Sequence, residues 1–469
     1  MLCELLTGTS YDFKENFSSF AFLNISELCG IVASLTLGCL HGWITEYRYM
    51  EISVKKKLMV VVGAGASIEL GMPSVNDVDS LFSEWAREGY LLAHDESKTL
   101  YCYIRDEVNR HYSLNPKEGL RKVTNFEELL YVMLQLSAAL GDDNYTLPLN
   151  AFLVLKKLPK IKSLAGDRFV DGNDLRQLCS RLVDKLTIEF RKRCNVAQKN
   201  NPLDYKEFEN FIGQLNSDFD VAFITLNYDN LITQVCPNLF TGFNENTGSF
   251  DAVSIYERTD WGLIYHLHGS VHFDMQGESL DMHAIKWNSD LSSVFSGNSF
   301  GRNSQETSEG VNMPTSVIVA GYGKTSQIQR VPFRTYYSRI DEISAKADAF
   351  LFMGYGFNDH HLNNALHSIR DGVTKRPVVV LDWAQDNQDP MQFRCDDWSK
   401  NLCKAVPINP SDMATRKYKH AAPDITYLKS SNEFEVSSNS DFPLSIWYGG
   451  FIQACKNYDK IKTELIGSN

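Results

Sequence analysis

The glycine turn Gly63-Ala64-Gly65-Ala66-Ser67 follows directly on the apolar run 58–62, and it constrains the fold more than any other segment. A β-branched run followed by two glycines and a small hydroxyl residue is typical of a buried strand, a tight turn and a helix start. Such a turn brings backbone N–H groups and a helix dipole up to a phosphate. The pattern therefore predicts a phosphate-binding α/β sheet, although a purely structural strand-to-helix turn also fits it.

Two commoner phosphate motifs do not fit the chain. A dehydrogenase-type G-x-G-x-x-G turn would place a glycine at Ile68. The segment Gly323-Lys324-Thr325 has the end of a P-loop, but Ile318 stands where that loop needs its first glycine. The pattern that remains, at 63–74, is G-A-G-x-S-x-x-x-G-M-P-S, which fits neither of these motifs.

Composition limits the kind of protein. With 43% hydrophobic and 12% aromatic residues among 469, the chain can bury a sizeable core. The net charge of −12 argues against strong, sequence-independent binding of nucleic acid, which needs many basic side chains, although a local basic patch stays open. The 10 cysteines form no C-x-x-C pair, so neither a disulfide framework nor a zinc knuckle is expected, and a reducing cytoplasmic location fits best.

The N-terminal segment 1–54 has an uncertain role. Its apolar run 28–40 is too short to span a bilayer, so we expect a buried or interface helix and no membrane insertion. Alternatively, Met50 marks the natural start of the core.

Six short apolar segments are typical of buried strands in a parallel sheet. They are 58–62, 221–226, 263–267, 316–320, 349–353 and 377–381. Between the first two, apolar residues recur at helical spacing, which predicts a large helical insertion at about 78–218. The segment 288–314, rich in Ser, Gly and Asn, predicts a mobile loop. The expected architecture is an α/β domain at 55–385, a Rossmann-like parallel sheet with that insertion, followed by a C-terminal extension at 386–469.

Two motifs stand at predicted strand ends, where ligands bind in open α/β sheets. In Thr225-Leu226-Asn227-Tyr228-Asp229, an amide and a carboxylate two residues apart can hold ribose hydroxyls or position a water. An Asx turn that caps the next helix would use the same residues.

The third motif is His266-Leu267-His268-Gly269-Ser270. Side chains two residues apart on a strand point the same way, so His266 and His268 should share one face, with His272 nearby. A metal site would need a further carboxylate or cysteine. A sugar hydroxyl that meets His268 as a base or orienting group is the favoured interpretation.

The segment Gly354-Tyr355-Gly356-Phe357-Asn358-Asp359 closes another predicted strand. Its glycines permit a close backbone approach to phosphate. We expect Asp359 to cap the following helix, and His360 and His361 to be solvated residues of its first turn.

Together the four motifs, in this order and each at a strand end, resemble the sirtuin family over about 55–385. The resemblance implies a sirtuin-like fold that binds NAD. It implies pyrophosphate contacts from Gly63, Ala64, Gly65 and Ser67, further cofactor contacts from Thr225, Gly354, Gly356 and Phe357, and an adenosine-ribose contact from Asp382. It also implies Asn227, Asp229 and His268 as the catalytic residues.

The departures from that family are equally informative. Deacylating sirtuins carry four zinc cysteines after the H-G pair, whereas this chain has none between Cys236 and Cys395, so no zinc is expected. Val75 and Asn76 replace the Phe-Arg pair of those enzymes. Asn125-Phe126-Glu127 resembles a helix signature of bacterial sirtuin-like proteins of antiphage defence, which hydrolyse NAD.

The resemblance thus implies an NAD glycohydrolase that depletes NAD during abortive infection. It also implies a homo-oligomer controlled by a HerA-type ATPase partner or a phage-derived activator. Two alternatives stay open: a protein deacylase or ADP-ribosyltransferase, and a sensing or scaffold module that binds NAD or ADP-ribose without turnover.

Overall fold

The computed structural model divides the chain into two units, Met1–Val54 and Lys55–Asn469. It describes residues 55–87, 99–114, 124–140, 158–161, 166–275, 285–293, 304–306, 312–314, 317–321, 324–366, 369, 376–386, 397–406 and 424–467. The expectations for 1–54, including the helix at 28–40 and the role of Met50, lie outside these residues.

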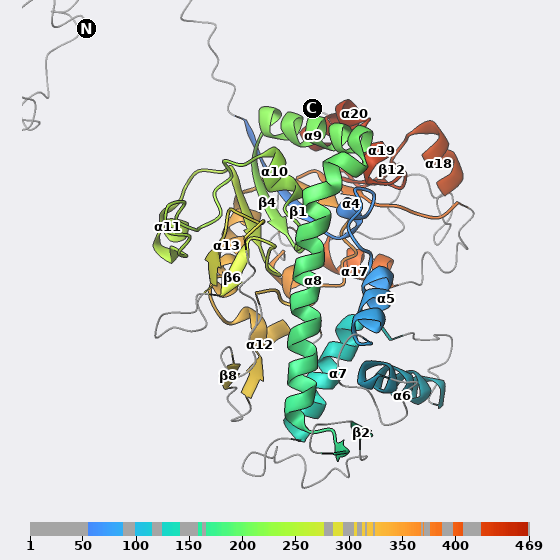
Figure 1. The fold of residues 1–469 in the computed structure, drawn as a ribbon. Coiled ribbons are helices and arrows are strands. Elements are labelled where there is room, and N and C mark those ends of the chain that lie inside the picture. The colour runs from blue at the N-terminus through green and yellow to red at the C-terminus, as the bar shows by residue number, and fades with distance from the viewer. Residues whose placement is uncertain are drawn as a thin grey trace, which may run out of the picture. The chain divides into compact units, whose positions relative to one another are not determined.

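A seven-stranded sheet organises the second unit (Figure 1). In spatial order its strands are β12 (Glu435–Val436), β13 (Leu444–Trp447), β11 (Val378–Leu381), β10 (Ala349–Met353), β1 (Lys56–Val62), β4 (Phe219–Thr225) and β5 (Leu263–His266). All neighbours pair in parallel except β12, which is antiparallel to β13. The chain passes from β1 to β4 and β5 on one side and then returns to β10 on the other. Such a reversal opens a crevice at the carboxyl ends of the strands.

This Rossmann-type sheet confirms the predicted fold class, and the predicted strands at 58–62, 221–226, 263–267, 349–353 and 377–381 are all in it. The prediction of a sheet strand at 316–320 is wrong. Its described residues from Val317 to Ala320 are buried, but only Ile318 pairs, in an isolated antiparallel bridge with Gly269. The apolar run is buried against the turn after β5, which explains a strand-like composition without a place in the sheet.

Helices occupy most of the described chain between β1 and β4. They are α4 (Gly65–Ile68), α5 (Val75–Trp85), α6 (Leu100–Leu114), α7 (Phe126–Ala139), α8 (Gly172–Asn200) and α9 (Pro202–Asp218), with the hairpin of β2 (Lys160–Ile161) and β3 (Arg168–Phe169) before α8. Their starts follow capping chemistry: Ser74 and Asp171 form capping boxes, and Asn125 accepts from the N–H of Glu128. The long helix α8 runs from α7 to α9 (Figure 1).

Shorter elements follow β4. They are α10 (Leu231–Val235), α11 (Ala252–Glu257), β6 (Phe273–Met275), β7 (Ile285–Trp287), β8 (Ser304–Glu306), β9 (Asn312–Pro314), α12 (Lys324–Ile328), α13 (Phe333–Lys346) and α14 (His360–Ala365). The antiparallel pair β8–β9 falls in the predicted loop 288–314, most of which lies outside the described residues.

The chain after β11 completes the sheet. It forms α17 (Asp397–Ala405), α18 (Ile425–Ser431), β12, β13, α19 (Phe451–Cys455) and α20 (Tyr458–Ile466). α20 packs against β10 and β11, and the carboxylate of Glu69 at the end of α4 accepts from the N–H of Ile452 at 2.8 Å. These residues, predicted as a C-terminal extension to which the sequence assigns no role, therefore support the central sheet and the glycine turn.

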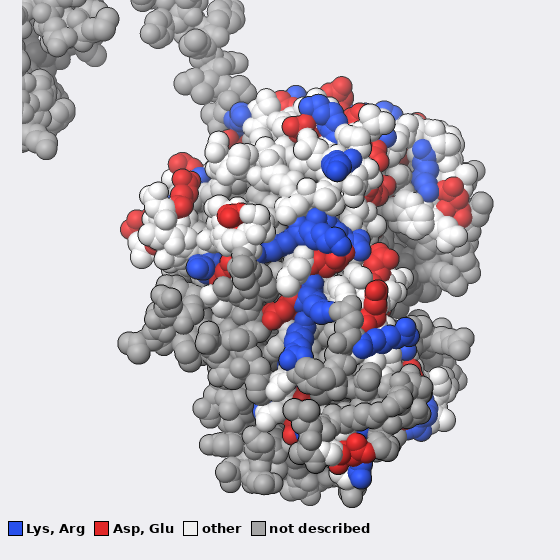
Figure 2. Space-filling model, in the orientation of Figure 1, with Lys and Arg blue, Asp and Glu red and all other residues white. Residues whose placement is uncertain are grey.

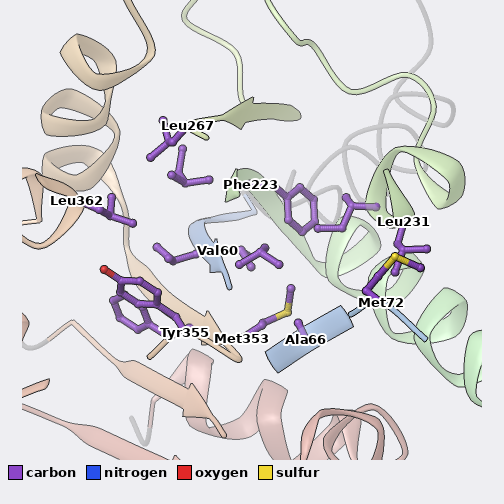
Figure 3. Close-up of a cluster of buried hydrophobic side chains, with 14 of the residues drawn as sticks. Val60, Ala66, Met72, Phe223, Leu231, Leu267, Met353, Tyr355 and Leu362 are labelled. Atoms are coloured by element: carbon purple, nitrogen blue, oxygen red, sulfur yellow. The ribbon is translucent and has the colours of Figure 1, made fainter. Parts of the chain in front are cut away.

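An apolar core lies around the strand ends. Figure 3 shows Val60, Phe223 and Met353, from three adjacent strands, gathered with Ala66 of α4. All four are buried, and burial of each of the larger side chains contributes about 1.5–3 kcal/mol. The turns that follow these strands are thus held on a packed support.

The surface carries charges of both signs. Figure 2 shows, on the face that α8 crosses, basic side chains across the middle with acidic ones directly beside them. Among the helices that the structure describes, none combines the length and apolarity needed to cross a membrane.

Candidate functional site

The two glycine motifs pack directly against each other at the ends of β1 and β10. The N–H of Gly63 donates to the carbonyl of Met353 at 2.9 Å, and that of Gly65 to Gly354 at 3.0 Å. A Cβ on Gly63 would lie 2.5 Å from the Gly354 oxygen, and one on Gly354 would lie 2.1 Å from the nitrogen of Ala66. Gly354 also has a φ of +57°. Glycine is therefore required here because two backbones meet, whatever ligand binds beside them.

Asn227, just after β4, ties this strand end to the glycine turn. Its Nδ2 donates to the carbonyl of Gly63 at 3.0 Å and to the hydroxyl of Ser67 at 2.9 Å. Its own N–H donates to the hydroxyl of Thr225 at 3.0 Å. No residue in the described part of the chain donates to Oδ1 of Asn227, so this acceptor is left for a ligand.

Asp229 combines a capping role with a place at the site. Its Oδ1 accepts from the N–H of Leu231 at 3.2 Å, at the start of α10, as the Asx-turn alternative predicted. Its Oδ2 is buried without a well-aligned donor among the described residues. Burial raises the pKa of Asp229, and the Ser67 hydroxyl and the Leu231 N–H offset this only in part.

His268 lies in the turn that follows β5. The strand ends at His266, and the N–H of Leu267 still donates to the carbonyl of Thr225 at 2.9 Å. The carbonyl of His268 then accepts from Val319 at 2.7 Å, so the buried run around Ile318 holds the turn from outside the sheet. His268 is only 5% exposed.

The expectation that His266 and His268 share one face is wrong, because β5 ends between them. His266 is fully buried beside the rings of Phe273 and Trp287, and burial lowers its pKa to about 3. His272 stacks on Trp287 with ring centroids 4.2 Å apart. Within the described ranges, no group of three or more His, Cys, Asp or Glu is arranged to hold a metal ion.

Asp359 caps α14, as predicted, but it also contacts His268. Its Oδ1 accepts from the N–H of Leu362 at 2.9 Å, and its Oδ2 lies 2.9 Å from Nε2 of His268 and 3.9 Å from Nζ of Lys324. Nζ of Lys324 is also 3.4 Å from Oε1 of Glu127, on α7. Four charged or titratable side chains from four separate elements therefore form one connected group.

Burial and charge set the protonation of this group. Burial alone would raise the pKa of Asp359, but the contact with His268 and the charge of Lys324 outweigh it and hold the pKa well below its usual range. Burial lowers the pKa of His268, and the charge of Lys324 lowers it further, against the opposite effects of Asp359 and Glu127. At neutral pH the arrangement therefore favours an ionised Asp359 beside a neutral imidazole.

A cavity of about 840 Å³ lies at these strand ends, a size typical of small-molecule and cofactor sites. Of the predicted site residues, it is lined by Gly63, Ala64, Ser67, Asn227, Asp229, His268, Gly354 and Gly356. It is also lined by residues that were not predicted as site residues, among them Asn125, Phe126, Glu127, Tyr228, Lys324, Asp359, His360 and His361.

Four predicted cofactor contacts do not line the cavity: Gly65, Thr225, Phe357 and Asp382. The N–H of Gly65 is used within the paired glycine turns, and Thr225 is buried beneath Asn227. The ring of Phe357 is fully buried in the core, and Asp382 accepts from the next N–H along the chain at 2.7 Å. Gly65 and Thr225 thus support cavity residues instead of lining the wall themselves.

The charged residues around His268 were seen in the sequence but given other roles. Lys324 belongs to the failed P-loop match, Glu127 to a family signature, and Asp359 to a helix cap. Each is separated from His268 by a long stretch of sequence, so only the strand order brings them together.

A buried ion pair fixes the segment after the His268 turn to α8. Nε of Arg191 donates to the carbonyl of Val271 at 2.7 Å, and a second guanidinium nitrogen to Oδ1 of Asp274 at 2.9 Å. Both side chains are at most 5% exposed. The helical insertion therefore anchors the loop that carries His268.

We expect Arg191→Met to lower the free energy of unfolding by about 3 kcal/mol, because it leaves the carboxylate of Asp274 buried without its charge partner. Urea unfolding measures the change. The matched control is Arg193→Met, two residues further along α8. Its more exposed guanidinium pairs with Glu189 and donates to the carbonyl of Gly71 at 3.2 Å, and its loss should cost less than about 1 kcal/mol. Equal losses for the two variants would contradict the anchoring role.

Comparison with known proteins finds a family match for part of the chain. Residues 221–400 match the SIR2-like domain family, a segment that carries Asn227, Asp229, His268, Gly354 and Asp359. No curated protein matches the chain.

Similar solved structures include Sir2 homologues. A mutant Sir2 homologue in complex with 2'-O-acetyl ADP-ribose is 12% identical, with 76% of this chain and 95% of that chain covered and a TM-score of 0.29. A second mutant, in complex with ADP-ribose, is 11% identical over 75% of this chain and 92% of that one, with a TM-score of 0.26. At such TM-scores, the fold assignment rests on the strand order of the chain itself.

Proposed function

From the SIR2-like match at 221–400 and the cavity beside it, we propose that this chain binds NAD and hydrolyses it to nicotinamide and ADP-ribose. The observation that carries the proposal is the convergence of Asn227, Asp229 and His268 on one cavity with the paired glycine turns. A module that only binds would have little need for a buried amide, carboxylate and imidazole at the same point.

The reaction breaks the bond between nicotinamide and its ribose, through an oxocarbenium-like state similar to that of glycoside cleavage. Nicotinamide departs as a neutral molecule, so no strong general acid is needed. The site must instead fix the ribose, place a water and stabilise the developing positive charge.

Each of the three side chains suits one of these tasks. Oδ1 of Asn227 would accept from the water or a ribose hydroxyl, because its Nδ2 is already used to hold the glycine turn. The buried carboxyl of Asp229 would hold the ribose and stabilise the cation, whose charge would in turn lower the raised pKa of this group. His268, favoured as a neutral imidazole, would accept a proton from a ribose hydroxyl or from the water.

Beyond the reaction itself, we propose NAD depletion in antiphage defence, by a cytoplasmic homo-oligomer that a HerA-type ATPase or a phage-derived protein activates. This extension is supported by the family resemblance of Asn125-Phe126-Glu127, which lies at the cavity wall. NAD levels in infected cells that express the wild-type chain or Asn227→Ala would test it. Equal NAD loss in both would contradict it.

We expect Asn227→Ala to slow nicotinamide release from NAD by about 10²-fold or more, since one positioned polar group is lost at the reacting centre. The measurement is nicotinamide release by the purified full chain, with NAD binding followed by calorimetry. The matched control is Asn210→Ala, on the exposed face of α9, which should retain full activity.

The outcomes separate the alternatives. Nicotinamide release by the wild-type chain that Asn227→Ala abolishes supports the hydrolase. Tight NAD binding without release, with or without a candidate activator, favours a sensing module. Release only in the presence of an acylated peptide identifies a deacylase.

A further inference from the structure

We propose that Asp359 is a positioning residue that holds His268 as its Nε2–H tautomer, so that Nδ1 is the atom that accepts the proton. The reaction in question is the proposed NAD hydrolysis, and the inference rests on that function only for its kinetic consequences. The tautomer itself is a property of the free protein.

The contact between the two side chains favours hydrogen on one of the two ring nitrogens. Oδ2 of Asp359 lies 2.9 Å from Nε2 of His268, and both side chains are 6% exposed. The two atoms are not aligned as a hydrogen bond, and neither has another hydrogen-bond partner among the described residues. An ionised carboxylate can only accept, so this contact favours the N–H on the nitrogen that faces it in a neutral imidazole. Nδ1 then keeps its lone pair, and no group in the described part of the chain bonds to it.

Three charged groups on three elements face His268, and their signs favour this state. They are Asp359 at the start of α14, Lys324 on α12 and Glu127 on α7. Lys324 lies within ion-pair distance of both carboxylates, which keeps Asp359 ionised while it disfavours a charged imidazole. The helical insertion thereby reaches the proposed base through Glu127.

A helix cap alone does not account for this geometry. Capping uses only Oδ1, which accepts from the N–H of Leu362. At Asp424, the cap of α18, one carboxylate oxygen likewise accepts from Tyr427 and the residue is exposed. At Asp359 the second oxygen is instead buried against His268, where an unpaired carboxylate would be costly.

The proton balance of the step is as follows. The C–N bond to nicotinamide breaks with its electron pair on nicotinamide, and the water oxygen bonds to the ribose carbon. The proton lost from the water, directly or through a ribose hydroxyl, goes to Nδ1 of His268. The charge of the resulting imidazolium is offset by Asp359 until the proton passes to solvent.

Asp359→Asn tests the proposal, because asparagine caps a helix as well as aspartate does but has no charge. We expect kcat to fall about 10²-fold or more with KM changed less than about threefold, as when the carboxylate behind a catalytic histidine is replaced. The acid limb of the kcat/KM profile should move to lower pH, because the carboxylate that favoured the imidazolium is gone.

Asp424→Asn is the matched control and should leave both rate and profile unchanged. A merely capping Asp359 would give an Asn variant with wild-type kcat and an unmoved acid limb, and this result would overturn the proposal.

A second measurement does not depend on activity. Nitrogen chemical shifts of imidazole-labelled full-length protein, with the His268 signal assigned by its loss in His268→Gln, report the tautomer directly. We expect Nε2–H in the wild type and a shift of population toward Nδ1–H in Asp359→Asn. A wild-type Nδ1–H tautomer would overturn the proposal even if NAD is hydrolysed. A wild type that releases no nicotinamide but shows Nε2–H would count against the hydrolase and for the positioning role.

Discussion

Replacing His268 with alanine is expected to slow nicotinamide release from NAD about 10²–10⁴-fold, with the dissociation constant for NAD changed less than about threefold. The substitution removes the proposed base, whereas the glycine turns and Asn227, which also line the cavity, remain. Because His268 is buried, with only 5% of the residue exposed, solvent cannot replace its side chain freely. Single-turnover nicotinamide release separates the chemical step from product release.

Two variants make this result interpretable. His111→Ala, in the exposed last turn of α6, removes a histidine that does not line the cavity and should keep full activity. His268→Gln retains polar atoms and much of the volume, so its melting temperature shows whether the fold survives. A His268→Ala variant that folds and keeps more than about a tenth of the wild-type rate would exclude the histidine as the base.

Gly354→Ala is expected to lower the free energy of unfolding by more than about 4 kcal/mol, or to prevent folding. The new Cβ would lie 2.1 Å from the nitrogen of Ala66 and 2.4 Å from the carbonyl carbon of Gly65. A φ of +57° adds about 1–2 kcal/mol of strain for any L side chain. The backbone cannot move away easily, because β10 is paired on both sides.

Gly356→Ala, in the same loop, is the matched control for urea unfolding. Its Cβ would meet only Nδ2 of Asn358, at an ordinary 3.6 Å, so the loss should stay below about 1 kcal/mol. Similar stability of the two variants would show that the glycine turns are not tightly packed.

The central strands were predictable because a strand buried on both faces is a continuous apolar run. The same rule misassigned Val317 and its neighbours, since burial against the His268 turn selects the same residues as burial in a sheet. It missed β13, whose four residues include a serine and follow a polar stretch. Its pairing with β11 depends on long-range topology that no local pattern records.

The site was predictable where one segment carries its own geometry. Asn227 and His268 come just after predicted strands, and the glycine motifs indicate a close backbone approach. The placement of Gly65, Thr225, Phe357 and Asp382 off the cavity wall depends on how far each turn continues before the next element begins. The contact of Asp359 with His268 requires the turn after β5 to meet the start of α14, which follows β10. In the sheet, β1 and β4 lie between β5 and β10, so no local pattern predicts this contact.

The order of the strands also bears on synthesis at the ribosome. The N–H of Lys57, at the start of β1, donates to a carboxylate of Asp348, 291 residues later, and Glu69 receives its donor from Ile452 after 383 residues. A nascent chain therefore carries the β10 edge of β1 and the end of α4 without these partners until the residues that supply them have been made. At about 5–20 residues per second, this interval lasts tens of seconds. During it β1 can pair with β4, but its β10 edge stays open to chaperones. The last residue that lines the cavity is His361, so the cavity can assemble only once β10 and the start of α14 have emerged.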